Sequence, residues 1–363
     1  MTSSNSSLVS SVATSSASTP LSSLSSVISL PSSIKSQAFA SKIVHALDLP
    51  TIQSKPSAND LLELLSLYSR GVSKNFAADE DKLLAPEGFV DWLTRLVGSG
   101  LYWIEDDDER EQVFDSASRR ISERCGRTAA PSMERAFDID GLSASVVLHE
   151  PSLTSDALGL KTWGSSLLLA KRLSKFHTTI ISRNTHRVLE LGSGTGLVGI
   201  VLGILGYRVL MSDLPEILPN LGTNIKHNEL EFGKLDIDVE ELDWNLPESS
   251  LAFKRNEKFD TVILSDPIYS LSHPPMIANV LKTIFDFQSP FSRVIIQLPL
   301  RANYSDVRAE FWKCLQAIGL KPCESLTEEG RDDFGEEIFL FSMWRPEAYV
   351  SDLSIDIHLE KNQ

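Results

Sequence analysis

Apolar and polar positions change their spacing repeatedly along the second half of the chain. Short apolar runs typical of buried strands alternate with longer segments whose apolar residues recur at helical spacing. Strands are predicted at 188–191, 207–212, 235–239, 261–265 and 293–298, a last pair of strands ends at 344, and helices are predicted at about 197–205, 216–228, 275–287 and 305–318. This alternation predicts an α/β fold, with a mainly parallel sheet covered by helices on both faces.

The first third of the chain has a different pattern. Residues 1–35 are mostly Ser, Thr and small apolar residues, and we predict a disordered tail because they offer too little burial to offset the entropy of ordering. Apolar residues then recur at helical spacing at 38–49, 59–70 and 86–97, with Asn59 as a candidate N-cap. We therefore expect a helical module at 36–135, the α/β domain at 136–348 and a C-terminal tail at 349–363.

Composition narrows the class of protein. The chain of 363 residues is 42% hydrophobic and 23% charged, as expected of a folded soluble protein, and its net charge of −15 argues against binding to a phosphate backbone. Three scattered cysteines predict neither a disulfide framework nor a zinc site, and no metal is expected. There is no apolar stretch of membrane-spanning length and no secretory signal, so a cytoplasmic location is expected.

The stretch with the strongest indication of ligand binding is Glu-Leu-Gly-Ser-Gly-Thr-Gly at 190–196, between a predicted strand and a predicted helix. Gly192, Gly194 and Gly196 suit a tight turn with positive φ that a ligand can approach closely. The same segment satisfies the dinucleotide pattern G-x-G-x-x-G. A dehydrogenase strand, however, runs apolar into its first glycine, whereas Glu190 lies inside this strand end. An acid there can receive a cationic, amine-bearing cofactor; the remaining interpretation is a turn that only packs a helix on the sheet.

The string at 188–199, followed by Ser-Asp-Leu-Pro at 212–215 and Asn-Ile-Lys-His-Asn at 224–228, resembles the seven-strand S-adenosylmethionine methyltransferases. Within them it is most similar to the family-16 protein-lysine methyltransferases. The resemblance covers roughly residues 140–346 and leaves the N-terminal part outside. It implies a Rossmann-like seven-strand sheet with one antiparallel strand, and S-adenosyl-L-methionine as the cofactor.

Four further residues are cofactor-binding candidates. Asp213 follows a predicted strand, so its carboxylate can accept both hydroxyls of a ribose; the alternative is a helix cap for the segment beginning at Pro215. The resemblance implies that Asp243 holds the exocyclic amine of the adenine and that Trp244 stacks on it. It also implies that Trp163, just ahead of a predicted helix, borders the cofactor, where the alternative is a tryptophan that covers the core.

The string Phe-Asp-Thr-Val-Ile-Leu-Ser-Asp-Pro-Ile-Tyr at 259–269 carries the catalytic candidates. A buried strand delivers Asp266 and Tyr269 to its carboxyl end, and they match the family's acid-x-x-Tyr motif. Pro267 departs from the commoner apolar residue and resembles the Asp/Asn-Pro-Pro-Tyr motif of other amino-group methyltransferases. We expect Asp266 to accept a hydrogen bond from the incoming amine and Tyr269 to wall the channel. His273 is a weaker candidate for the substrate mouth, and the alternative is a solvated loop histidine. Arg301 is similar in place to an arginine at the end of the family's fifth strand, and the alternative is a fold-stabilising salt bridge.

The resemblance implies a protein-lysine N-methyltransferase, most like the fungal enzymes that methylate translation elongation factors, with a lysine of elongation factor 1A or 3 as the substrate. A monomer is expected, without direct contact to nucleic acid or membrane. Two alternatives stay open: a methyltransferase for a small molecule or nucleic acid, and a non-catalytic cofactor-binding interaction module.

Overall fold

The computed structural model describes residues 45–69, 73–76, 85–125, 131–152, 158–182, 185 and 187–350. The predicted tail at 1–35, the start of the predicted helical module and nearly all of the predicted C-terminal tail lie outside these ranges. The predicted domain boundaries at 135 and 348 stay predictions.

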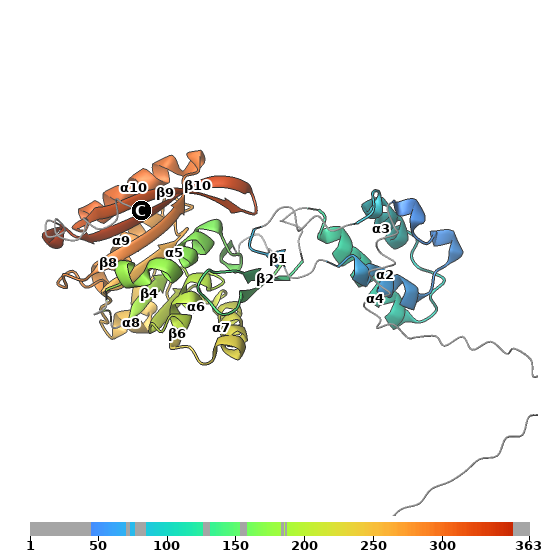
Figure 1. The fold of residues 1–363 in the computed structure, drawn as a ribbon, viewed down its shortest axis with the longest axis horizontal. Helices are drawn as coiled ribbons and strands as arrows, with labels where there is room; N and C mark the ends of the chain where they lie inside the picture. The colour runs from blue at the N-terminus through green and yellow to red at the C-terminus, as the bar shows by residue number, and fades with distance from the viewer. Residues whose placement is uncertain are drawn as a thin grey trace, which may run out of the picture. The chain divides into compact units, whose positions relative to one another are not determined.

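A seven-stranded sheet forms the centre of the α/β part, with strand order β6-β5-β4-β7-β8-β10-β9. Figure 1 shows this part of the chain with helices packed around the strands. β10 runs antiparallel to both β8 and β9, and the other neighbouring pairs of this sheet are parallel, which confirms the predicted fold class. The chain leaves β4 first toward β5 and later returns to β7 on its other side, so the carboxyl end of β4 is the topological switch point. The strands span Val188–Leu191 (β4), Val209–Asp213 (β5), Ile237–Glu241 (β6), Thr261–Ser265 (β7), Arg293–Pro299 (β8), Leu320–Asp332 (β9) and Gly335–Pro346 (β10).

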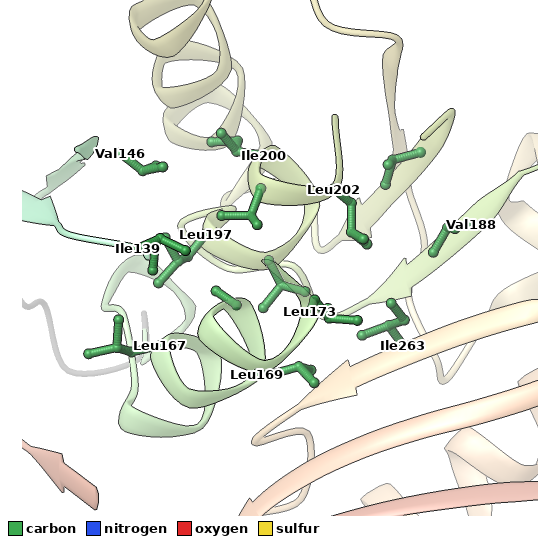
Figure 2. Packing of buried hydrophobic residues seen from close by; sticks show 14 of the residues in the cluster. Ile139, Val146, Leu167, Leu169, Leu173, Val188, Leu197, Ile200, Leu202 and Ile263 are labelled. Carbon is green, nitrogen blue, oxygen red and sulfur yellow. The ribbon is translucent and has the colours of Figure 1, made fainter. Parts of the chain in front are cut away.

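Helices cover both faces of this sheet because its central strands are apolar on both sides. Alternate residues of each strand enter two separate cores: Val188 packs in the core of α5, α6 and α7, whereas Leu189 packs in the core of α8, α9 and α10. Figure 2 shows the first core, where leucines of α5 and α6 meet Val188 and Ile263 of the sheet. The helices span Gly164–Ile180 (α5), Leu197–Ile204 (α6), Leu218–Phe232 (α7), Leu251–Lys254 (α8), His273–Ile284 (α9) and Ser305–Ala317 (α10).

The described residues of the preceding part include three α-helices, α2 (Ala58–Leu67), α3 (Phe89–Gly98) and α4 (Asp107–Ser122), which share a core of their own. The prediction that Asn59 caps the first of them is wrong, because Ser57 is the N-cap and accepts a hydrogen bond from the backbone N–H of Asp60. Between α2 and α3 the chain contributes β1 (Ser73–Lys74), which pairs with β2 (Met133–Phe137); β3 (Val146–Glu150) completes the three-stranded sheet β1-β2-β3. The helical pattern of the sequence gave no sign of β1.

The small sheet is fastened to the large domain by a row of asparagines on α7. Asn224 and Asn228 each exchange two hydrogen bonds with the backbone of β3 (Val146–Glu150), at His149 and Val147, over 2.8–3.2 Å. Asn224 also donates to the carbonyl of Thr195 in the glycine loop at 2.9 Å. The spacing of four residues puts both amides on one face of the helix. The two asparagines of the Asn-Ile-Lys-His-Asn string therefore hold β3 against α7, and Asn224 also holds the glycine loop.

Candidate active site

A cavity of about 210 Å³ lies at the carboxyl ends of β4, β5 and β7, where the topology predicts a ligand site. Eight of the ten residues predicted to bind cofactor or act in catalysis line it: Trp163, Gly192, Gly194, Asp213, Asp243, Trp244, Asp266 and Tyr269. The other two, Glu190 and Gly196, are not among its lining residues. The fold thus gathers into one cavity residues that lie more than a hundred positions apart in the sequence.

The glycine loop has the backbone conformation that its sequence predicts. Gly192 has φ of 71°, and a Cβ there would lie 3.2 Å from the ring of Trp244, so the missing side chain leaves room between loop and indole. Gly196 has φ of 97° and is the N-cap of α6. A Cβ at Gly196 would lie 2.6 Å from Leu221, which means that this glycine allows helix packing below the loop rather than ligand approach.

Asp213 ties the end of β5 to the glycine loop. Its Oδ2 accepts a hydrogen bond from the backbone N–H of Gly194 at 2.7 Å, and its Oδ1 accepts one from Leu214 at 2.8 Å. Burial raises the pKa of this carboxyl to about 6, although both hydrogen bonds oppose the shift. Asp213 does not cap α7, whose N-cap is Ile217 without a side-chain bond. Each carboxylate oxygen retains a lone pair for a further donor.

Glu190 faces the helix instead of the cavity. Its side chain is 1% exposed, and its Oε2 lies 2.7 Å from where a Cβ of Gly199 would be. Burial raises the pKa of Glu190 to about 8, partly offset by hydrogen-bonding groups of Ser193 and Gly199. Its neighbours Leu189 and Leu191 enter the opposite core, so strand alternation turns Glu190 toward α6. Direct contact with a bound amine stays a prediction.

Two tryptophans and an aspartate form other parts of the wall. Trp163 is the N-cap of α5, and its Nε1 donates to the carbonyl of Leu158 at 3.3 Å. Trp244 lies edge-on to His273, with ring centroids 5.8 Å apart. Asp243 accepts a hydrogen bond from the backbone N–H of Asn245 at 2.8 Å, which orients its carboxylate at the strand end. The carboxylate of Asp243 and the indole of Trp244 thus both line the cavity, as the predicted adenine site requires.

The backbone conformation and the side-chain environment of Asp266 are both typical of a residue that contacts a ligand. It adopts φ of 53°, a left-handed conformation that costs energy in a residue other than glycine. Its backbone N–H donates to Gln297 at 2.9 Å, whereas its Oδ2 is buried and has no hydrogen-bond partner among the described residues. Burial raises the pKa of Asp266 to about 7; nearby Arg301 lowers it and Asp332 raises it. A buried carboxylate oxygen without a donor is an acceptor held ready for one.

Tyr269 stands beside Asp266 at the mouth of the cavity and is 51% exposed. Burial of its inner part, together with Asp213 and Asp266, raises the pKa of its hydroxyl, so it is neutral at physiological pH. Its ring meets His273 edge-on, with centroids 4.2 Å apart. His273 is therefore not a solvated loop residue, since it packs between Tyr269 and Trp244 and burial lowers its pKa.

Arg301 forms a salt bridge and also lines the cavity. Its Nη2 donates to Oδ2 of Asp332 at 2.5 Å, which is the predicted salt bridge, and the residue also lines the cavity. Its guanidinium carbon lies 5.6 Å from the centroid of the Trp163 ring. Arg301 thus connects the β9–β10 hairpin to the cavity wall beside Asp266.

Sequence reasoning missed several contacts across the cavity. Ser166 and Ser265 join α5 to β7 with their hydroxyl oxygens 3.0 Å apart, and Thr162 meets Thr195 of the glycine loop at 2.7 Å. Tyr304 lines the cavity as well. Serines and threonines at strand ends and helix starts are too common for their pattern to have marked these four residues.

No group of three or more His, Cys, Asp or Glu side chains is placed to hold a metal ion in the part of the chain that the structure describes. Within the same ranges, no helix is both long and apolar enough to cross a membrane.

Comparison with known proteins assigns the chain to a family. A family model described as lysine methyltransferase matches residues 144–316. Protein-lysine N-methyltransferase rrg1 of Schizosaccharomyces pombe is 32% identical over 300 residues, which cover 81% of this chain and 94% of that protein. The chain belongs to the lysine methyltransferase family. This assignment confirms the predicted enzyme class and, with it, S-adenosyl-L-methionine as the methyl donor.

Other similarities of this lysine methyltransferase are more partial. Protein-lysine N-methyltransferase EFM2 of Saccharomyces cerevisiae is 38% identical over 251 residues, which cover 64% of this chain and 58% of the length of that relative. The crystal structure of an S-adenosylmethionine-dependent methyltransferase from Agrobacterium tumefaciens is similar with a TM-score of 0.41 and 16% identity, covering 60% of this chain and 71% of that one.

The residues of the cavity suit the cofactor of this family. S-adenosylmethionine combines an adenine, a ribose with two hydroxyl donors, and a cationic methionyl part. The cavity offers an acid and an indole at Asp243 and Trp244, carboxylate acceptors at Asp213, and a loop without side chains at Gly192 and Gly194. Acidic groups at both ends favour a ligand with positive charge.

Proposed function

We propose that this enzyme transfers a methyl group from S-adenosylmethionine to the ε-amine of a lysine in translation elongation factor 1A or 3. The observation that supports an amine acceptor most directly is the buried, unpartnered Oδ2 of Asp266 at the cavity wall. The protein acceptor is supported by the relatives EFM2 and rrg1, both of which are protein-lysine N-methyltransferases. The elongation factor rests on the resemblance of the Ser-Asp-Pro-Ile-Tyr string at 265–269 to the fungal enzymes.

Asp213 is proposed to accept the ribose hydroxyls, with Asp243 and Trp244 holding the adenine between them. Trp163 borders the methionyl part, and Gly192 and Gly194 let it approach the loop backbone. Glu190 is proposed to act on the cofactor through the loop, because its side chain lies under Ser193 and Gly199 and not at the cavity wall. Gly196 contributes by allowing α6 to start beneath the loop.

Bound S-adenosylmethionine would supply an electrophilic methyl group, and S-adenosylhomocysteine would leave as the bond from sulfur to that methyl breaks. An exposed lysine is protonated at neutral pH, so its amine must lose a proton before it can attack. In the proposed mechanism the carboxylate of Asp266 accepts a hydrogen bond from the incoming amine, favours its entry as a cation and aims the lone pair once the proton has passed to water. Tyr269 narrows the mouth and offers its hydroxyl as a second polar contact. Orientation of this kind can account for a large part of the rate.

The first experiment is methylation of purified elongation factors 1A and 3 with tritiated S-adenosylmethionine. We expect label in one of them with the wild-type enzyme and none with Asp266→Ala, which should still bind the cofactor in calorimetry. Label in neither factor, but in another protein of a lysate that lacks this enzyme, would remove the elongation factor and keep the lysine acceptor. Cofactor binding with no labelled protein would remove the protein acceptor and favour a small molecule.

The cytoplasmic location, the monomeric state and the absence of nucleic-acid contact belong to the same proposal. The last of these rests on the net charge of −15, whereas the location and the monomeric state are expectations from the sequence.

A further inference from the structure

The turn between β9 and β10 holds an exposed aromatic ring beside the catalytic end of the cavity. Phe334 is 69% exposed, and its ring stacks on that of Trp163 with centroids 6.0 Å apart and planes 17° apart. Arg301 lies against both rings, 6.0 Å from the centroid of Phe334. Because Trp163 and Arg301 line the cavity and Arg301 acts on the pKa of Asp266, Phe334 lies at the rim on the side of Asp266.

Ion pairs fix this turn on both sides. Asp332 is 3% exposed, pairs with Arg301 and accepts a hydrogen bond from the backbone N–H of Phe334 at 2.7 Å. Asp333 pairs with both terminal nitrogens of Arg135, at 2.8 and 3.0 Å, and Arg135 is 4% exposed. Phe334 itself gains little from burial in the fold. A rigidly held aromatic side chain at a surface loses little entropy when a partner covers it, which is typical of interface anchors.

Other apolar side chains stand exposed around the same cavity. Tyr269, Leu158 and Leu214 line it and are 51%, 37% and 37% exposed, and Leu271, two residues beyond Tyr269, is 65% exposed. They come from three segments, because Tyr269 and Leu271 share one loop. Exposed apolar side chains grouped around a polar site indicate a surface that binds a macromolecule.

The charge around the turn favours a basic partner. The stretch Glu328–Glu337 carries six acids and the single cation Arg331. Arg301, Arg135 and Arg172 neutralise three of the acids. Glu329 and Glu336 remain exposed to solvent. A chain with net charge −15 attracts a lysine-bearing basic segment and repels an acidic one.

We propose that the turn at 332–334 is the docking element for the protein substrate, and that it receives a basic segment flanking the target lysine. This inference rests on the proposed lysine methylation and adds where the substrate protein binds. Phe334 packs against a side chain next to the lysine, Glu336 attracts a neighbouring cation, and the lysine itself passes between Tyr269 and Trp163 to Asp266.

The test is steady-state methylation of elongation factor 1A or 3, whichever the wild-type enzyme labels, by Phe334→Ala. We expect KM for the protein substrate to rise about tenfold, as for loss of an interface anchor, with kcat at saturation unchanged. Calorimetry should give the same affinity for S-adenosylmethionine as in the wild type. Phe334→Leu should recover part of the loss, and Glu336→Lys should raise KM most at low salt.

Leu326→Ala is the matched control. Leu326 is 43% exposed on β9 of the same hairpin, about 20 Å along the strand from the turn, and its loss should leave KM unchanged. An unchanged KM in Phe334→Ala would overturn the docking proposal while leaving lysine methylation intact. So would a lower cofactor affinity at unchanged KM, because Phe334 would then act through Trp163 alone. Absence of any labelled protein with the wild-type enzyme would defeat the proposed function itself, before any variant is compared.

Discussion

The ionisation of Asp266 should be visible in the pH dependence of methylation. Burial raises the pKa of this carboxyl to about 7, so its accepting form is lost as the pH falls below neutrality. About a tenth of the molecules are ionised one unit below that pKa and about nine-tenths one unit above it. The free lysine must also lose a proton, with a pKa of about 10.4. The logarithm of kcat/KM for the protein should therefore rise with a slope of two below pH 7 and a slope of one above it.

Asp266→Asn keeps the shape of the side chain and removes its ionisation. We expect this variant to be slower at every pH and to show a single slope of one across the range, measured with saturating cofactor. The cofactor must be saturating because burial also raises the pKa of Asp213, to about 6. Protonation of Asp213 would otherwise weaken cofactor binding and change the pH profile of methylation. The other titratable groups that face Asp266 are Tyr269, Arg301 and Asp332.

Tyr269→Phe serves as the control for that profile. It should lower the rate and keep the break near pH 7. The reasoning about Asp266 is refuted if the break persists in Asp266→Asn, or if the wild-type profile shows a slope of one down to pH 6.

Three further outcomes follow from the same structure. Asp213→Ala should weaken S-adenosylmethionine binding about 10- to 100-fold by calorimetry, since it removes charge-assisted hydrogen bonds, whereas Asp213→Asn, which can still accept from Gly194, should lose less. Glu190→Gln should raise the free energy of unfolding at pH 8 by up to about 5 kcal/mol. With a folded-state pKa near 8, the native protein binds more protons than the unfolded chain between about pH 4.5 and 8, so the stability of the wild type falls as the pH rises through that window. In urea titrations, the difference in stability between variant and wild type should therefore shrink toward pH 5. Asn224→Ala should cost about 3 kcal/mol in the same assay, because it leaves buried groups of His149 and Thr195 without partners.

The parts of the fold that the sequence predicted best are those with one dominant physical signal. The strands β4 and β7 begin and end where the apolar runs at 188–191 and 261–265 begin and end, since both are fully buried. The edge strand β6 lies two residues later than predicted, because its exposed acids carry no alternation that fixes its start. The short strand β1 was missed, since two residues paired with β2 leave no periodic pattern.

The candidate site was predictable to the extent that its residues follow strands. Asp213 and Asp266 end buried strands that are neighbours of β4, so their meeting at one edge follows from topology. The orientation of Glu190 did not follow, because a side chain in a strand faces one of two cores and the sequence around it is apolar in both directions. Phe334 had no signal at all, since its place beside Trp163 depends on where a long hairpin returns to the domain.

Asp266 and the turn at 332–334 are joined by charge as well as by position. Arg301 pairs with Asp332, stacks on Trp163 and Phe334, and lowers the pKa of Asp266 against the effect of burial. A cationic substrate segment that docks on Phe334 brings further positive charge to the same place, which favours the ionised form of Asp266. Docking of the substrate and ionisation of Asp266 are therefore coupled electrostatically. The break in the pH profile should accordingly lie lower for kcat, which reports the bound complex, than for kcat/KM, which reports the free enzyme.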